Sequence, residues 1–239
     1  MAINEVHLAP IGLAALGGAG LAAIWTVDGL PAIGWTVALA YLATSNVLLL
    51  IALRRRRAPR LGWANLVTAT RSALVGVITG LVAASFVAPI SVPLLICLVV
   101  PALALDAVDG WIARRTGTTT ELGARFDMEV DAFLLLLLSV YVAPILGPWV
   151  LAIGLMRYVF VAAGWMLPWL RLQLSPRYWR KVVTAVQGIA LTLAASGLVP
   201  ELAGLIVGVA LVLLVESFGR DVVWLALRSR SRRAVVGAS

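Results

Sequence analysis

The chain has 239 residues, of which 62% are hydrophobic and 13% are charged, and its mean hydropathy is +1.02. This composition excludes a water-soluble domain and indicates an integral membrane protein. The single histidine and single cysteine exclude an internal disulfide and argue against a zinc site and against Ser-His-Asp or Cys-His catalysis.

Apolar windows bounded by Gly, Pro and charged residues predict eight membrane-spanning helices. At about 20 residues per span, little of the chain is left for a soluble domain. The first span lacks preceding basic residues and an evident cleavage site, so we expect a retained helix and not a signal peptide. Cys97 lies in the fourth span and is expected to be a buried, inert thiol. The expected spans cover residues 8–27, 31–53, 65–88, 91–113, 123–145, 148–170, 181–199 and 201–227.

Basic residues orient these spans. They gather in connections on one side, at residues 54–60, 114–115, 171–181 and 228–233, and the opposite connections contain no Lys or Arg. Because cytoplasmic loops carry the excess of Lys and Arg, both termini are expected in the cytoplasm of a multi-pass cell (inner) membrane protein. The net charge of +8 then reflects topology and contact with anionic membrane lipids. Nucleic-acid binding is not expected, since the basic residues are divided among short segments.

Residues 106–131 hold six of the eleven acidic side chains. At about 100° per helical residue, two sets of side chains each share one helix face. The first set spans roughly 140° and comprises Asp106, Asp109, Gly110, Ala113 and Arg114. The second spans about 80° and comprises Gly123, Asp127 and Asp131, with Glu129 facing away. The two helices run in opposite directions from the short loop 115–122, so the four aspartates are expected to converge near the cytoplasmic membrane face.

Four converging carboxylates in a low-dielectric place repel one another unless cations compensate them. All-oxygen ligation suits Mg²⁺ or Mn²⁺, and two ions are expected. The small residues Gly110, Ala113 and Gly123 leave space for a bulky ligand, and Arg114 is suited to a phosphate oxygen. This combination predicts a phosphorylated substrate. The alternative, a closely packed hairpin with acids paired to arginines, does not require three small residues on the acidic face.

The pattern D-x2-D-G-x2-A-R-x8-G-x3-D-x3-D, residues 106–131, resembles the signature of the CDP-alcohol phosphotransferase (CDP-alcohol phosphatidyltransferase) family. Every fixed position is present. The resemblance implies an all-α integral membrane protein with a six-helix catalytic core over residues 61–228. Two additional N-terminal helices and a basic connection would occupy residues 1–60, and a basic cytoplasmic tail residues 229–239. A homodimer is also implied.

The resemblance further implies transfer of a substituted phosphate from a CDP-linked donor to an alcohol hydroxyl, with release of CMP, in phospholipid biosynthesis. Asp131 would be the general base on the acceptor. Metal ligands would be Asp106, Asp109, Asp127 and Asp131. The segments "NLVTATR" (65–71) and "KVVTAVQ" (181–187) resemble family segments at the cytoplasmic entrances of their helices. Nucleotide-binding residues would be Gly110, Ala113, Arg114, Gly123, Asn65 and Thr68.

Donor and acceptor are less constrained. In many bacterial relatives CDP-diacylglycerol is the donor and glycerol phosphate, inositol phosphate or serine the acceptor, whereas other relatives use a CDP-alcohol. The segment "FDMEVDA" (126–132) departs from the LDPxxDK-like form common in glycerol-phosphate enzymes, which weakens that acceptor. A snorkelling role for Arg71 and a structural ion pair for Arg157 remain open. Candidate acceptor-binding residues are Arg71, Arg157, Arg180 and Lys181.

Two other functions use similar residues. An intramembrane Mg²⁺-dependent prenyltransferase also carries aspartate-rich motifs, but it leaves the G-x2-A-R spacing unexplained. A cation transporter with four aspartates on its ion path is expected to place them near the membrane midplane and not towards one face. In the last span, Glu216 and Asp221 are expected to pair with a neighbouring helix or a partner subunit, and the sequence does not decide between these.

Overall fold

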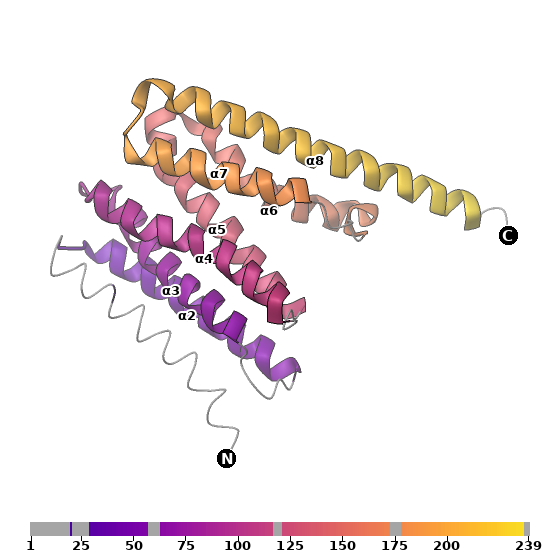
Figure 1. Ribbon diagram of the computed structural model, residues 1–239, viewed down its shortest axis with the longest axis horizontal. Coiled ribbons are helices and arrows are strands. Elements are labelled where there is room, and N and C mark those ends of the chain that lie inside the picture. The colour runs from indigo at the N-terminus through magenta and orange to yellow at the C-terminus, as the bar shows by residue number, and fades with distance from the viewer. Residues whose placement is uncertain (1–19, 21–28, 57–62, 117–120, 173–177, 237–239) are drawn as a thin grey trace, which may run out of the picture. The chain divides into compact units, whose positions relative to one another are not determined.

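The computed structural model describes residues 20, 29–56, 63–116, 121–172 and 178–236. Within these ranges the chain forms α-helices and two short 3-10 helices and no strand, which confirms the predicted all-α class (Figure 1). The expected first span, residues 8–27, lies outside the described residues apart from Gly20. The elements are α2 (Ala32–Arg56), α3 (Trp63–Ala84), α4 (Val92–Thr116), α5 (Glu121–Leu146), η1 (Pro148–Val150), α6 (Leu151–Met166), η2 (Pro168–Arg171), α7 (Tyr178–Ser196) and α8 (Pro200–Val236).

Prolines set the ends of α6, which is shorter than the predicted span 148–170. Pro148 opens the 3-10 turn η1 ahead of the helix, where its missing N–H removes no helical hydrogen bond. Leu167 precedes Pro168 and is extended, with φ −119° and ψ 90°, because a residue before proline is pushed out of the helical region. In contrast, residues 220–236 contain no Gly or Pro, and α8 continues through them, past the predicted end at residue 227.

Three helical segments are long and apolar enough to cross a membrane, among the residues that the structure describes: Phe126–Leu146, Pro148–Met166 and Pro200–Ser229. Shorter apolar stretches lie in α2, α3 and α4. Many large apolar side chains on α8, Leu205 and Val212 among them, are exposed, as expected for a surface that faces lipid. The protein is therefore a membrane protein. The number of spans and their orientation stay predictions.

The chain forms two compact units, residues 1–137 and 138–239, with the boundary inside α5. In the first unit, α3 lies between α2 and α4 (Figure 1). Its buried side chains include Val75, Ile78 and Leu81. Cys97, on α4, is exposed, so the expectation of a buried thiol is wrong. The apolar run around it predicted a helix correctly but could not give the rotation of α4 about its axis.

Glycines bring α2 and α3 close together. A Cβ atom added to Gly34 on α2 would lie 2.8 Å from the carbonyl oxygen of Gly80 on α3. Close backbone approach through small residues is typical of helix pairs in membranes, where packing replaces the hydrophobic effect as the force between helices.

Gly34→Ala is therefore expected to lower the free energy of unfolding by about 1–3 kcal/mol, because the α2 and α3 backbones must separate to admit the methyl group. The melting temperature of the purified protein in detergent measures the effect. Gly204→Ala on α8 is the matched control, since nothing lies within 4 Å of the added Cβ and alanine favours the helix. Equal melting temperatures for the two variants would contradict the close packing of α2 on α3.

In the second unit, α7 and α8 lie side by side and run in opposite directions (Figure 1). The turn between them contains Gly197 at φ +66°, a conformation that glycine adopts without steric strain. The buried amide of Gln187 on α7 donates a hydrogen bond to the carbonyl oxygen of Ala210 on α8, at 2.7 Å. This polar contact fixes the register of the two helices.

Candidate active site

Helix α5 presents two carboxylates on one face. Asp127 and Asp131 are four residues apart, so their side chains lie one above the other on the helix. Their side chains are 28% and 24% exposed, respectively. Glu129, between them in sequence, is exposed. The predicted separation of Glu129 from the two aspartates agrees with this arrangement.

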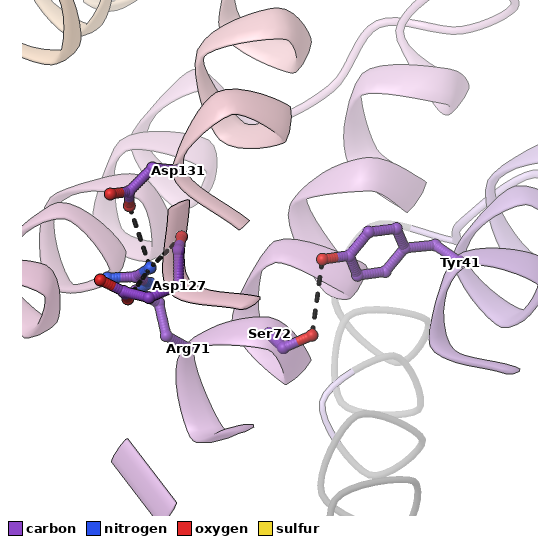
Figure 2. A network of polar contacts seen from close by, with 5 residues as sticks. All are labelled: Tyr41, Arg71, Ser72, Asp127 and Asp131. Carbon is purple, nitrogen blue, oxygen red and sulfur yellow. Dashed lines mark hydrogen bonds and ion pairs between the residues drawn. The ribbon is translucent and has the colours of Figure 1, made fainter. Parts of the chain in front are cut away.

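Arg71 on α3 reaches both carboxylates. Its side chain is 1% exposed, and its Nη2 lies 2.5 Å from Oδ1 of Asp127 and 3.0 Å from Oδ1 of Asp131 (Figure 2). The same nitrogen donates to the backbone carbonyl oxygen of Asp127 at 3.1 Å. The guanidinium lies between two carboxylates that would otherwise repel each other, and these contacts compensate its buried charge. Three of the sequence-predicted site residues are thus brought together.

The remaining predicted residues of the first unit lie on helical backbone, but their side chains fall outside the described part of the chain. Helix α4 continues through residue 116 past Pro101, so the three-residue spacing of Asp106 and Asp109 lies on one helix, as expected. Predicted residues in this group are Asp106, Asp109, Gly110, Ala113 and Arg114 on α4, Gly123 on α5, and Asn65 and Thr68 on α3.

Three predicted acceptor-binding residues belong to the second unit. Arg157 lies on α6 and is partly exposed, and Lys181 lies on α7 and is exposed. Arg180 on α7 forms an ion pair with Asp221 on α8, with Nε 3.5 Å from Oδ2. Asp221 thus pairs with a neighbouring helix of the same chain, one of the two possibilities that the sequence left open.

Glu216 takes part in a second polar contact between these helices. Its Oε2 accepts a hydrogen bond from the indole nitrogen of Trp179 on α7 at 3.3 Å. Its other carboxylate oxygen is paired with Arg220, one turn further along α8. Glu216 and Asp221 therefore link the middle of α8 to the first turn of α7.

The described residues fit a divalent cation. Oxygens of Asp127 and Asp131 both reach one cationic nitrogen, so they converge as ligands of a single cation do, and each carboxylate keeps exposed surface. Carboxylate oxygens are hard donors that suit Mg²⁺ or Mn²⁺. Two of the four expected ligands are among the described side chains, and no group of three such residues comes together there.

The position of Arg71 in the sequence indicates an acceptor ligand or a snorkelling side chain and does not predict its contacts with the aspartates. One signal was present, because an arginine inside an apolar helix requires a buried counter-charge. The contact of Tyr41 with Ser72, also drawn in Figure 2, had no such signal in the sequence.

A family model described as CDP-alcohol phosphatidyltransferase matches residues 61–216, more than half of the chain. The chain belongs to the CDP-alcohol phosphatidyltransferase family. The match runs from the start of α3 into α8 and contains Arg71, Asp127 and Asp131. No curated protein and no solved structure shows significant similarity to the chain.

Membership of the CDP-alcohol phosphatidyltransferase family makes the protein a transferase of lipid synthesis. Such enzymes transfer a phosphate-linked group from a CDP-alcohol to an alcohol acceptor, and the family generally depends on divalent metal ions. The predicted family is confirmed by this match. Helix α2, at residues 32–56, precedes the matched segment.

Proposed function

We propose that the protein transfers a phosphatidyl group from CDP-diacylglycerol to the hydroxyl of an alcohol acceptor and releases CMP, in phospholipid biosynthesis. The observation that carries this proposal is the convergence of Asp127 and Asp131 on one cationic nitrogen, inside the segment that matches the family. A site that collects carboxylates around positive charge is suited to divalent ions and, through them, to a pyrophosphate.

Each predicted residue has a role in this proposal. Two Mg²⁺ or Mn²⁺ ions, held by Asp106, Asp109, Asp127 and Asp131, would orient the pyrophosphate and neutralise charge that develops on the CMP leaving group. Asp131 accepts the proton of the acceptor hydroxyl while the hydroxyl oxygen forms a bond to the β-phosphorus of the donor. The bond from that phosphorus to the CMP oxygen breaks, and CMP leaves with the electron pair. The cytidine nucleotide is held by Gly110, Ala113, Arg114, Gly123, Asn65 and Thr68.

Acceptor recognition is assigned to Arg157, Arg180 and Lys181, together with Arg71. In the structure, contacts with Asp127 and Asp131 engage the Arg71 guanidinium and Asp221 engages Arg180. Lys181 is exposed on α7, so we expect its variants to affect acceptor binding most directly.

The wider arrangement follows the sequence predictions. Eight spans would place both termini and the site at the cytoplasmic face, where a water-soluble nucleotide and lipid tails can meet. The catalytic core would cover residues 61–228, between the N-terminal helices of residues 1–60 and the basic tail of residues 229–239. The protein would act as a homodimer in the cell membrane.

An acceptor panel tests the proposal. Purified protein with CDP-diacylglycerol and Mg²⁺ is supplied singly with glycerol 3-phosphate, inositol 1-phosphate, serine or inositol, and CMP is measured. We expect CMP to form only with one acceptor. For a phosphate-bearing acceptor, Lys181→Gln should raise its KM by roughly five- to a hundredfold through loss of a charge-assisted contact. The same amount of CMP with and without each acceptor would contradict the assignment of donor and acceptor.

A further inference from the structure

Helix α2 precedes the residues that match the family, yet it is docked on the helices of the candidate site. A Cβ atom added to Gly76 on α3 would lie 2.5 Å from Cδ2 of Leu42 and 3.2 Å from Cδ1 of Tyr41, both on α2. Leu42 itself is buried. With Gly34 against Gly80, α2 therefore meets α3 closely at two places, which are about two turns apart on α2 and about one turn apart on α3.

Tyr41 connects α2 to both helices that carry the carboxylate pair. Its ring stacks on Phe133 of α5, with ring centroids 4.8 Å apart and planes 13° from parallel. Its hydroxyl lies 3.4 Å from Oγ of Ser72 on α3 (Figure 2). Ser72 is buried, and its Oγ also lies 2.7 Å from Oγ of Ser45 on α2. The polar group of Ser72 is thus satisfied by two hydroxyls from α2.

These contacts fall beside the ion pairs of the site. Ser72 directly follows Arg71 on α3, and Phe133 comes two residues after Asp131 on α5. Tyr41 therefore touches α3 one residue after Arg71 and α5 two residues after Asp131 along the chain.

The ion pairs need such support because they form only over a small range of distances between α3 and α5. The contacts of 2.5 and 3.0 Å from one nitrogen to the two carboxylates are lost if α3 and α5 shift against each other by about 1 Å. Functional side chains keep productive geometry only when the residues around them fix the elements that carry them. Tyr41 supplies a rigid ring and a hydroxyl at the place where α3 and α5 would otherwise move apart.

We propose that α2 is a positioning element of the carboxylate site and that Tyr41 is the positioning residue through which it acts. This inference rests on the proposed function, in which Asp127 and Asp131 bind divalent metal. Tyr41 touches no metal or substrate. It holds α3 and α5 in the register that lets the two carboxylates converge.

The test compares two α2 residues that both pack on α3. Tyr41→Leu removes the stack and the hydroxyl, whereas Leu42→Ala shortens the neighbouring buried side chain and leaves the contacts with Ser72 and Phe133 in place. The readout is the dissociation constant of Mn²⁺ for the full-length protein in detergent without substrate, from the electron paramagnetic resonance signal of free Mn²⁺. Melting temperature and CMP release are recorded for the same samples.

We expect Tyr41→Leu to raise the Mn²⁺ dissociation constant roughly two- to tenfold, because the carboxylates lose their alignment while the Arg71 charge stays. Leu42→Ala should lower the melting temperature and leave Mn²⁺ binding within about twofold. An unchanged or lower Mn²⁺ dissociation constant in Tyr41→Leu, or an equal rise of this constant in both variants, would overturn the inference. Helix α2 would then have a structural role alone.

Two further variants keep the test decisive if Tyr41→Leu does not fold. Tyr41→Phe and Ser72→Ala each remove a single hydroxyl, and both should weaken Mn²⁺ binding in the same direction; no change in either would overturn the inference. Wild-type CMP release separates the two claims. If Mn²⁺ binding depends on Tyr41 but the wild type releases no CMP, the proposed reaction fails and the positioning role stands.

Discussion

Replacing Asp131 by asparagine is expected to lower acceptor-dependent CMP release by about 10²- to 10⁴-fold, the range for loss of a general acid–base group. Asparagine keeps the shape of the side chain but cannot accept the acceptor proton. It also loses the ionic contact with Arg71, which is 3.0 Å away. The turnover number under saturating donor and acceptor measures the effect.

Glu129→Gln is the matched control for Asp131→Asn. It makes the same carboxylate-to-amide change on the same helix, at an exposed position between the two aspartates in sequence, and should leave turnover within about twofold. The turnover of Asp127→Asn should differ from that of both variants in its dependence on Mg²⁺, since a higher Mg²⁺ concentration partly compensates a lost metal ligand. If Asp131→Asn kept more than a tenth of the wild-type turnover, its role as the base would be refuted.

Arg71→Gln should destabilise the metal-free protein by about 1.5–3 kcal/mol, because the hydrogen bonds from its buried guanidinium to two carboxylates are lost. In a chain of this size that corresponds to a fall of roughly 3–12 °C in melting temperature. Added Mg²⁺ should raise the melting temperature of the variant by more than it raises that of the wild type, since a divalent cation neutralises the same carboxylates. CMP release should fall about 10- to 100-fold.

Arg220→Gln serves as the control for Arg71→Gln. Arg220 is exposed and paired with Glu216 within α8, and such pairs contribute about 0.5 kcal/mol or less. The melting temperature of the Arg220→Gln variant should therefore differ little from that of the wild type, and the difference should not depend on Mg²⁺. Equal losses in the two variants would show that Arg71 does not neutralise the aspartates.

Helix positions were predictable because they depend on local sequence. Apolar windows gave the positions of α2 to α8 closely, since Pro, Gly and charge mark where a hydrophobic helix can start or stop. The error at α6 came from counting Pro168 and its neighbours as part of the span. The predicted span 201–227 agrees with the apolar segment Pro200–Ser229. Helix α8 continues beyond it to Val236, because arginine and serine continue a helix without difficulty.

Side-chain contacts between helices were less predictable. The shared face of Asp127 and Asp131 followed from their four-residue spacing on one helix. Their meeting with Arg71 depends on the rotation of α3 against α5, which a single sequence does not contain. For the same reason the apolar run around Cys97 gave a helix but not its exposed side, and Tyr41 could not be linked to Phe133, 92 positions further along the chain.

The most direct test of the central claim is the product that leaves the donor. Purified wild-type protein is incubated with CDP-diacylglycerol, Mg²⁺ and the active acceptor, and CMP and pyrophosphate are both quantified, with an EDTA-treated sample alongside. We predict one CMP for each phospholipid formed, no pyrophosphate, and no product with EDTA. An intact donor in every sample would contradict the account. Release of pyrophosphate when a prenyl diphosphate is supplied in its place would then favour prenyl transfer, and Mg²⁺ uptake into vesicles that contain the protein would favour a transporter.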